Sequence, residues 1–240
     1  MQAVFNEFRT AVPLIWNGNP YLMQIIGFTL EVAVIATSIA AVIGIPLGLV
    51  LGLGRFGGRQ FLRVIANASL GLPPALVGAA LFLLFAVPAP LGPLHLLSTR
   101  RVVFIAQTIL ALPYTVALTA AAMEALPEGL LVQARSLGAS RLAVAILAVR
   151  EARVGVVAAI LAALGTSLSE VAAIAILGGN IYGYNQTLAS ATLYEVNAAD
   201  YPMALAIALV LLGMILILMG GFALLQHQSD GLRLRFRTTT

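Results

Sequence analysis

Five long apolar stretches, nearly free of charge, leave this chain few folds to adopt. Only 9% of its 240 residues are charged and 61% are hydrophobic, and its mean hydropathy is +1.02, whereas a soluble domain carries about 25% charged residues. A helix of about 20 apolar residues is long enough to cross the hydrocarbon core of a bilayer. The sequence therefore predicts an all-α integral membrane protein with about five transmembrane helices.

The apolar stretches divide the chain into three parts. We expect a short N-terminal interfacial segment at 1–24, with Trp16 anchored at headgroup depth. A transmembrane domain at 25–226 and a basic tail at 227–240 follow. Within that domain the predicted spans are residues 25–53, 64–87, 102–123, 154–177 and 203–225. The adjacent Pro73 and Pro74 remove two backbone donors, so the second span should kink there.

The arginines are distributed unevenly over the two sides of this arrangement. All thirteen basic residues of the chain are arginine. Three, at positions 9, 100 and 101, fall on one side. The other ten fall on the opposite side, at 55, 59, 63, 135, 141, 150, 153, 233, 235 and 237. Because short loops rich in arginine stay in the cytoplasm, we expect the N-terminus outside and the C-terminus in the cytoplasm.

Several kinds of chemistry are excluded by what the sequence lacks. Without lysine it has no phosphate-binding loop of the G-x-x-x-x-G-K-[ST] type. Without cysteine it has no disulfide and no thiolate nucleophile, and His95 and His227 are too far apart in sequence to suggest a metal site. We expect no cofactor. The net charge of +4 indicates topology and not nucleic-acid binding, because the arginines lie beside apolar spans.

Residues 124–153 form a charged island between two apolar stretches, with seven ionisable side chains. Each would cost about 2.5–3.5 kcal/mol at the bilayer centre, so this connector lies in water or at the membrane surface. Pro127 can start a helix, Gly138 can end it in the left-handed conformation, and Ser140 can cap the next helix. We expect two helices and a tight turn, which would serve either as a docking surface or as an ordinary loop on the membrane.

The stretch from Ala134 to Ser140 resembles the cytoplasmic Glu-Ala-Ala loop of ATP-binding-cassette importer permeases. Gly138 matches the family glycine and Ala134 the third motif position. Val132 and Gln133 depart from the pattern, since they stand where the family usually has Glu and Ala. The resemblance implies a short coupling helix that docks on a separate cytoplasmic ATPase. The implied contact residues are Val132, Gln133, Ala134, Arg135, Leu137, Gly138, Ala139 and Ser140.

Five further motifs resemble the tungstate-type permeases, which are related to molybdate and sulfate permeases. They lie at residues 71–74, 106–113, 150–153, 169–171 and 178–181. The resemblance implies the MetI-like fold of type I importers and a non-catalytic subunit in the prokaryotic plasma (inner) membrane. It also implies partners: a second copy of the chain, a cytoplasmic ABC ATPase and an extracytoplasmic oxyanion-binding protein. We expect import of tungstate, or of molybdate or sulfate, by alternating access driven by the ATPase.

Glu170 is the most costly residue to place in the bilayer, because it is a carboxylate well inside the fourth predicted span. An ionised carboxylate would repel a dianion, so we interpret Glu170 as a gate or helix-bracing residue that bonds to neighbouring spans. Neutral donors could instead line the pathway, or simply pack the helices. The candidates for pathway or gate are Pro73, Pro74, Gln107, Thr108, Thr115, Thr166, Ser167, Ser169, Glu170 and Asn180.

Two other classes of function are weighed against import. An autonomous channel or ion-coupled transporter would need no ATPase, but the chain is short and shows no clear inverted repeat. An intramembrane enzyme would need a base beside Ser167 or Ser169, and no histidine lies in a predicted span. Both alternatives are therefore less favoured.

Overall fold

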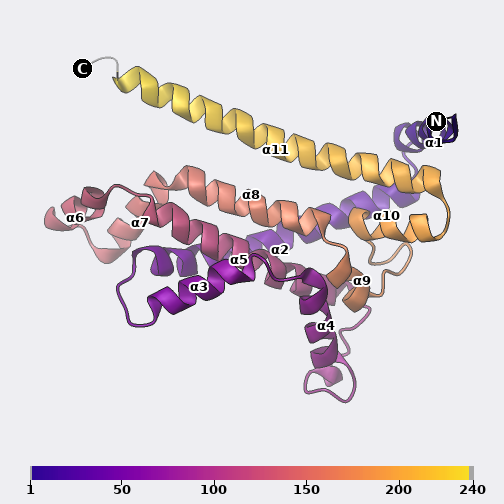
Figure 1. The fold of residues 1–240 in the computed structure, drawn as a ribbon, viewed down its shortest axis with the longest axis horizontal. Helices are drawn as coiled ribbons and strands as arrows, with labels where there is room; N and C mark the ends of the chain where they lie inside the picture. The colour runs from indigo at the N-terminus through magenta and orange to yellow at the C-terminus, as the bar shows by residue number, and fades with distance from the viewer. Residues whose placement is uncertain (1, 238–240) are drawn as a thin grey trace.

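The computed structural model describes residues 2–237, and it describes side chains for residues 7–127 and 129–221. Over this part of the chain the secondary structure is entirely helical (Figure 1). The elements are α1 (Gln2–Trp16), α2 (Pro20–Leu53), α3 (Arg59–Ser69), α4 (Pro74–Phe85), the 3-10 turn η1 (Gly92–Leu94), α5 (Arg100–Glu124), α6 (Glu128–Ser136), α7 (Arg141–Glu151), α8 (Arg153–Ser169), α9 (Ala172–Gly178), α10 (Leu188–Asn197) and α11 (Tyr201–Arg237).

Three of the described helices are long and apolar enough to cross a membrane alone, namely α2, α5 and the Tyr201–Gly221 part of α11. Two bent pairs, α3 with α4 and α8 with α9, would each add one crossing, which brings the number to five. The expectation of an all-α membrane protein is confirmed. The second predicted span is bent at the expected prolines, whereas the fourth, for which no break was expected, is also sharply bent.

The first break, between α3 and α4, is a sharper change of direction than the kink expected at Pro73 and Pro74. The chain turns by 102° between α3 and α4, where Pro73 precedes the helix and Pro74 occupies its first turn. Residue 73 must avoid the helical region because a proline follows it, so α3 ends before the pair. Helix α3 begins at Arg59, between the first two predicted spans at 25–53 and 64–87, and buries none of its residues. This short charged helix therefore lies on the surface.

The second break falls at Glu170, where α8 and α9 meet at 57°. Glu170 has extended backbone angles, and its Oε1 accepts a hydrogen bond of 2.9 Å from the backbone N–H of Ala173. The carboxylate thereby satisfies one of the N–H groups that the start of α9 leaves unpaired. The expected bracing by neighbouring spans is corrected: the hydrogen bond shown for this side chain runs to its own chain, three residues on.

Glycines bring α2 and α5 close together in the centre of the molecule. A Cβ at Gly44, Gly48 or Gly52 would meet Thr115, Thr119 or Met123 at less than 3 Å, so the two helices run parallel at close approach. Thr115 Oγ1 donates to the carbonyl oxygen of Ala40 at 2.9 Å across this contact. Small residues spaced four apart are typical of such tight helix pairs in membranes.

Helix α8 packs antiparallel to α5 and also contacts α2, so it belongs to the same helical core. Gly155 lies against Ala122, and Ala163 shares an apolar cluster with Ala111. Continuing this register places Gln107 level with residues 167–170. The two broken segments also meet, since Gly78 of α4 lies against Ala173 of α9. The break at Glu170 is thus held between α4 and α5.

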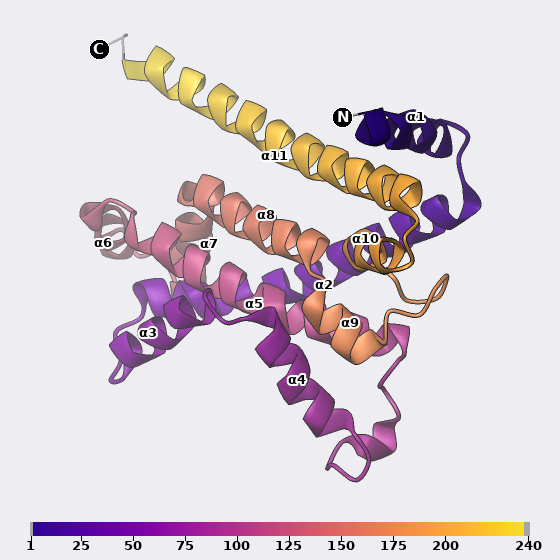
Figure 2. The same ribbon diagram turned by 45° about the vertical axis from the view of Figure 1, so that its right-hand side comes forward.

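The two ends of the chain form a separate layer. Helix α1 packs against α11, which runs along the outside of the bundle (Figures 1 and 2). Helix α1 continues through Pro13 and α2 already starts at Pro20, so the first span begins earlier than expected. Helix α10 lies between the fourth and fifth predicted spans, at 154–177 and 203–225. The expected basic tail at 227–240 falls outside the residues whose side chains are described.

Candidate functional site

The connector between α5 and α8 folds as two helices and a tight turn, as expected. Pro127 precedes α6, and Gly138 has a φ of +85° just after its end. The N–H of Ala139 bonds the carbonyl of Ala134 at 3.0 Å, which closes the turn. Ser140 then caps α7, its Oγ accepting from the N–H of Ala143 at 3.2 Å. The backbone of this turn is therefore held by its own hydrogen bonds.

Apolar side chains protrude from the α6–α7 turn into solvent. Leu137 is 88% exposed, Leu142 70% and Val132 58%. Figure 1 shows α6 and α7 at one end of the molecule, away from α4 and α10. A cluster of exposed large apolar residues on a hydrogen-bonded turn is typical of a docking surface. Of the other predicted contact residues, Gln133, Arg135 and Ser140 are exposed, whereas Ala134 and Ala139 are half-buried.

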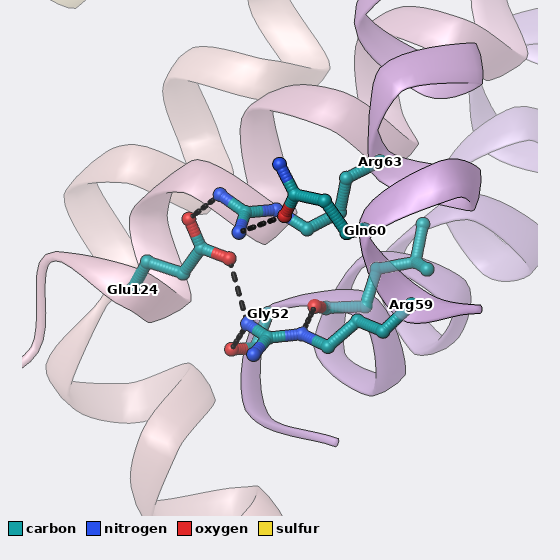
Figure 3. A network of polar contacts seen from close by, with 6 residues as sticks. Gly52, Arg59, Gln60, Arg63 and Glu124 are labelled. Atoms are coloured by element: carbon teal, nitrogen blue, oxygen red, sulfur yellow. Dashed lines mark hydrogen bonds and ion pairs between the residues drawn. The ribbon is translucent and has the colours of Figure 1, made fainter. Parts of the chain in front are cut away.

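A network of charges ties this end of α5 to α2 and α3 (Figure 3). Glu124 accepts from Arg59 at 2.8 Å and also pairs with Arg63. Arg59 in addition donates to the last carbonyls of α2, at Leu51 and Gly52, each at 2.6 Å. Sequence reasoning missed this network because its partners lie 61 to 65 residues apart. The only local signal is a basic residue just beyond a helix C-terminus.

A layer of buried polar side chains lies at the level of the second break. We call Thr37, Gln107, Ser167 and Glu170 the polar layer. Each is less than 7% exposed, and the register described above places the last three on facing turns of α5 and α8. Thr37 joins them because the parallel packing of α2 and α5 brings it level with Gln107. This layer unites three of the predicted pathway residues and one, Thr37, that was not predicted.

Three members of the polar layer lack a hydrogen-bond partner among the described residues. They are Thr37 Oγ1, both amide atoms of Gln107, and Ser167 Oγ. An unpaired buried polar group costs about 1–3 kcal/mol, and such groups in folded proteins often mark a functional role. The layer thus holds neutral polar groups that are buried and unpaired among the described residues. Within the described chain, no group of His, Cys, Asp and Glu could hold a metal ion.

The other predicted pathway residues are engaged elsewhere. The hydroxyls of Thr108, Thr166 and Ser169 donate to carbonyls of their own helices. Thr115 is used in the α2–α5 contact, about two helical turns from Gln107. Pro73 and Pro74 lie at the α3–α4 corner. Asn180 donates to the carbonyl of Ser190 at 3.0 Å and so holds the loop between α9 and α10.

The opposite end of the bundle carries an aromatic and acidic cluster that sequence reasoning also missed. Tyr21 and Tyr182 stack with their ring centroids 4.3 Å apart, and the hydroxyl of Tyr21 donates to Gln186 at 2.8 Å. Glu195 is 5% exposed beside them. Burial raises the pKa of the Glu195 carboxyl, although a hydrogen bond with Tyr21 acts in the opposite direction. These contacts fix α10 against the start of α2.

Comparison with known proteins adds to this picture. Residues 44–228 match the family described as "Binding-protein-dependent transport system inner membrane component". A probable anion ABC transporter permease protein of Haloferax volcanii is 33% identical over 82% of this chain and 87% of its own length. The tungstate uptake system permease protein of Peptoclostridium acidaminophilum is 31% identical over 88% of this chain and 93% of its own length.

Sulfate transport system permease proteins are more distant, at 26% identity for the one from Escherichia coli over 88% of this chain and 78% of its own length. Among solved structures, an inward-facing methionine ABC transporter, MetNI, aligns with a TM-score of 0.68. The match covers 89% of this chain and 96% of that one, at 18% identity. At this identity the likeness concerns the fold, which is the MetI-like fold expected from the sequence.

Proposed function

The chain belongs to the family of binding-protein-dependent transport system inner membrane components, and we propose that it is the permease of an ABC importer for tungstate. Molybdate and sulfate are the nearest alternatives. The relatives named for tungstate and for anions align over more than four fifths of this chain. The importer would sit in a prokaryotic inner membrane with the N-terminus outside, as the arginine distribution favours.

The single observation that carries the coupling role is the exposed α6–α7 turn. Leu137 projects from it with 88% of its surface in solvent, and Gly138 supplies the left-handed backbone that shapes it. We infer that a cytoplasmic ABC ATPase receives this turn in a groove. ATP can impose a direction only if the ATPase contacts the turn differently in its two nucleotide states. The adjoining α5 and α8 would carry the movement into the membrane.

The polar layer is the proposed element of the translocation pathway. Its unpaired amide and hydroxyl groups at Gln107 and Ser167 can donate to an oxyanion without holding it as tightly as a cation would. Glu170 caps α9 and is proposed as a brace of the broken helix, not as an anion ligand. Two copies of the chain would enclose the pathway between them and rock about it. The oxyanion would be delivered by an extracytoplasmic binding protein.

The chain itself is proposed to be non-catalytic, with ATP hydrolysed on the partner chain. Purification from its native membrane should retain an ABC ATPase. In nanodiscs, the hydrolysis rate of this complex should rise with a tungstate-loaded binding protein and not with an empty one. Flux of tungstate through the purified chain alone, without ATP, would contradict the proposal and favour an autonomous channel or ion-coupled transporter.

A further inference from the structure

A groove runs along the side of the α6–α7 turn, between the turn and the end of α2. Its volume is about 640 Å³. Arg55, Arg135 and Arg141 line it, together with apolar residues of α2 and α7 that include Val50 and Val144. A second groove of about 640 Å³ adjoins it and shares Arg55 and Arg135. Neither groove is lined by a residue of the polar layer.

The charge of this groove is not neutralised within the described part of the chain. Arg55, Arg135 and Arg141 form no ion pair there, whereas Arg59 and Arg63 nearby are paired with Glu124. Three like charges around one concavity raise its positive potential and draw an anion. The three guanidinium groups also present several N–H donors, which suit the oxygens of a phosphate.

The opposite wall of the groove is apolar and lies at the end of α2, one of the helices long and apolar enough to cross a membrane. Val50 is 50% exposed on the last turns of α2, and the apolar run of α2 ends at Leu53, two residues before Arg55. Val144 and Ala145 of α7 extend the apolar wall. The groove thus has arginines on one wall and aliphatic side chains on the other. This combination fits a phosphate attached to acyl chains better than a free anion.

We propose that this groove binds the headgroup of an anionic phospholipid from the cytoplasmic leaflet. The phosphate would contact Arg55 and Arg141, which are not among the predicted ATPase contacts, and the charge of Arg135 would add to the positive potential. The acyl chains would follow Leu49 and Val50 along α2. A bound lipid would connect the end of α2 with the α6–α7 turn. This inference rests on the proposed orientation, in which that turn faces the cytoplasm.

The test uses the purified permease–ATPase complex after delipidation, examined by native mass spectrometry. The complex is titrated with phosphatidylglycerol, phosphatidylcholine or inorganic phosphate. We expect phosphatidylglycerol to bind at least tenfold more tightly than phosphatidylcholine, because each arginine near a lipid phosphate contributes about fivefold in affinity. The double variant Arg55→Gln/Arg141→Gln should lose about 25-fold in affinity for phosphatidylglycerol.

The matched control is Arg150→Gln, an exposed arginine of α7 that does not line the groove, and it should bind phosphatidylglycerol as the unaltered complex does. Equal binding of the two lipids to the unaltered complex would overturn the inference, and this result needs no variant to fold. Phosphate binding as tightly as phosphatidylglycerol would overturn it too, in favour of a free-anion site. The lipid-binding assay does not measure transport. If the complex fails to bind the lipid, the proposed import can still be tested separately by uptake.

Discussion

Gln107 buries a primary amide among apolar helices, and neither of its polar atoms has a partner among the described residues. Its helix neighbour Thr108 shows the usual solution, a hydroxyl bonded to the carbonyl of Phe104. The contrast shows why residue type alone did not separate pathway candidates from packing residues. Both look polar in the sequence, and only the structure shows which donors are already used.

We expect Gln107→Met to separate stability from transport. Replacing an unsatisfied buried amide with an apolar group of similar shape is neutral or stabilising, so the melting temperature in detergent should stay the same or rise. Uptake of tungstate into proteoliposomes should fall about tenfold, since a hydrogen bond to a charged group contributes about 1.5–3 kcal/mol. Leu110→Met, on the same buried side of α5, is the control and should leave uptake intact. Full uptake by Gln107→Met would remove this residue from the pathway.

Gly138 is the residue on which the shape of the α6–α7 turn depends. Its φ of +85° costs about 1–2 kcal/mol for a residue with a side chain, more for a β-branched one. We expect Gly138→Val to distort the turn and uncouple ATP hydrolysis from uptake, while the protein still inserts into the membrane. Gly18→Val is a matched control, because Gly18 has a φ of +63° and open space around it but lies between α1 and α2. Normal coupling in Gly138→Val would argue against docking through this turn.

At the scale of elements, the contact between α2 and α5 shows a pattern that sequence reasoning passed over. The glycines at 44, 48 and 52 repeat every fourth residue on one face of α2. This repeat is the signal that would have placed α5 against that face. The network around Glu124 has no comparable repeat, because its three charged residues come from two elements that only the fold brings together.

Gly48→Ala should destabilise the protein despite its better helix propensity. The new Cβ would lie 2.7 Å from Thr119 Cβ and from the carbonyl oxygen of Val116, so the helices must separate. We expect a cost of about 1–3 kcal/mol, as for overpacked cores, seen as a lower melting temperature in detergent. Gly27→Ala is the control on the same helix, since its Cβ would meet nothing within 4 Å. It should be neutral or slightly stabilising.

Glu124→Gln tests whether the charge network holds α5 against α2 and α3, close to the α6–α7 turn. The side chains of Arg59, Arg63 and Glu124 are 27–30% exposed. Loss of their ion pairs should therefore lower the free energy of unfolding by no more than about 1 kcal/mol. We expect a larger effect on coupling, with more ATP hydrolysed per tungstate imported, because α5 is no longer tied to α2 and α3. Glu151→Gln, exposed on α7, is the control. An unchanged ratio of ATP to tungstate would make the network purely structural.

At the scale of the whole molecule, α2, α5 and α8 form the core, and α1 with α11 forms a layer beside it (Figure 2). The α6–α7 turn and α10 lie at opposite ends of the bundle (Figure 1). A bilayer between these two ends would separate the proposed ATPase surface from the side proposed for the binding protein. The transport proposal requires this separation.

The orientation can be tested with single cysteines, because the chain has none of its own. Ser136→Cys, on the exposed end of α6, should react with a membrane-impermeant maleimide only in inside-out vesicles. Asn197→Cys, at the exposed end of α10, should react only in right-side-out vesicles. The reverse pattern would place the coupling turn outside and contradict the proposed docking on a cytoplasmic ATPase.

The sequence by itself determined the membrane class, the α6–α7 turn and the family, because these depend on local properties. Apolar length decides what can span a bilayer, and Gly138 with Ser140 decides where two helices end and begin. Pro73 and Pro74 also indicated a kink in the second span. Only the structure showed how sharply that span turns, that the fourth span is broken, that Glu170 caps α9, and that Arg59 meets Glu124. The ion pair between Arg59 and Glu124 joins segments far apart in sequence. The packing of α2, α5 and α8 likewise decides which buried polar groups are paired and which, as at Gln107, lack a partner among the described residues.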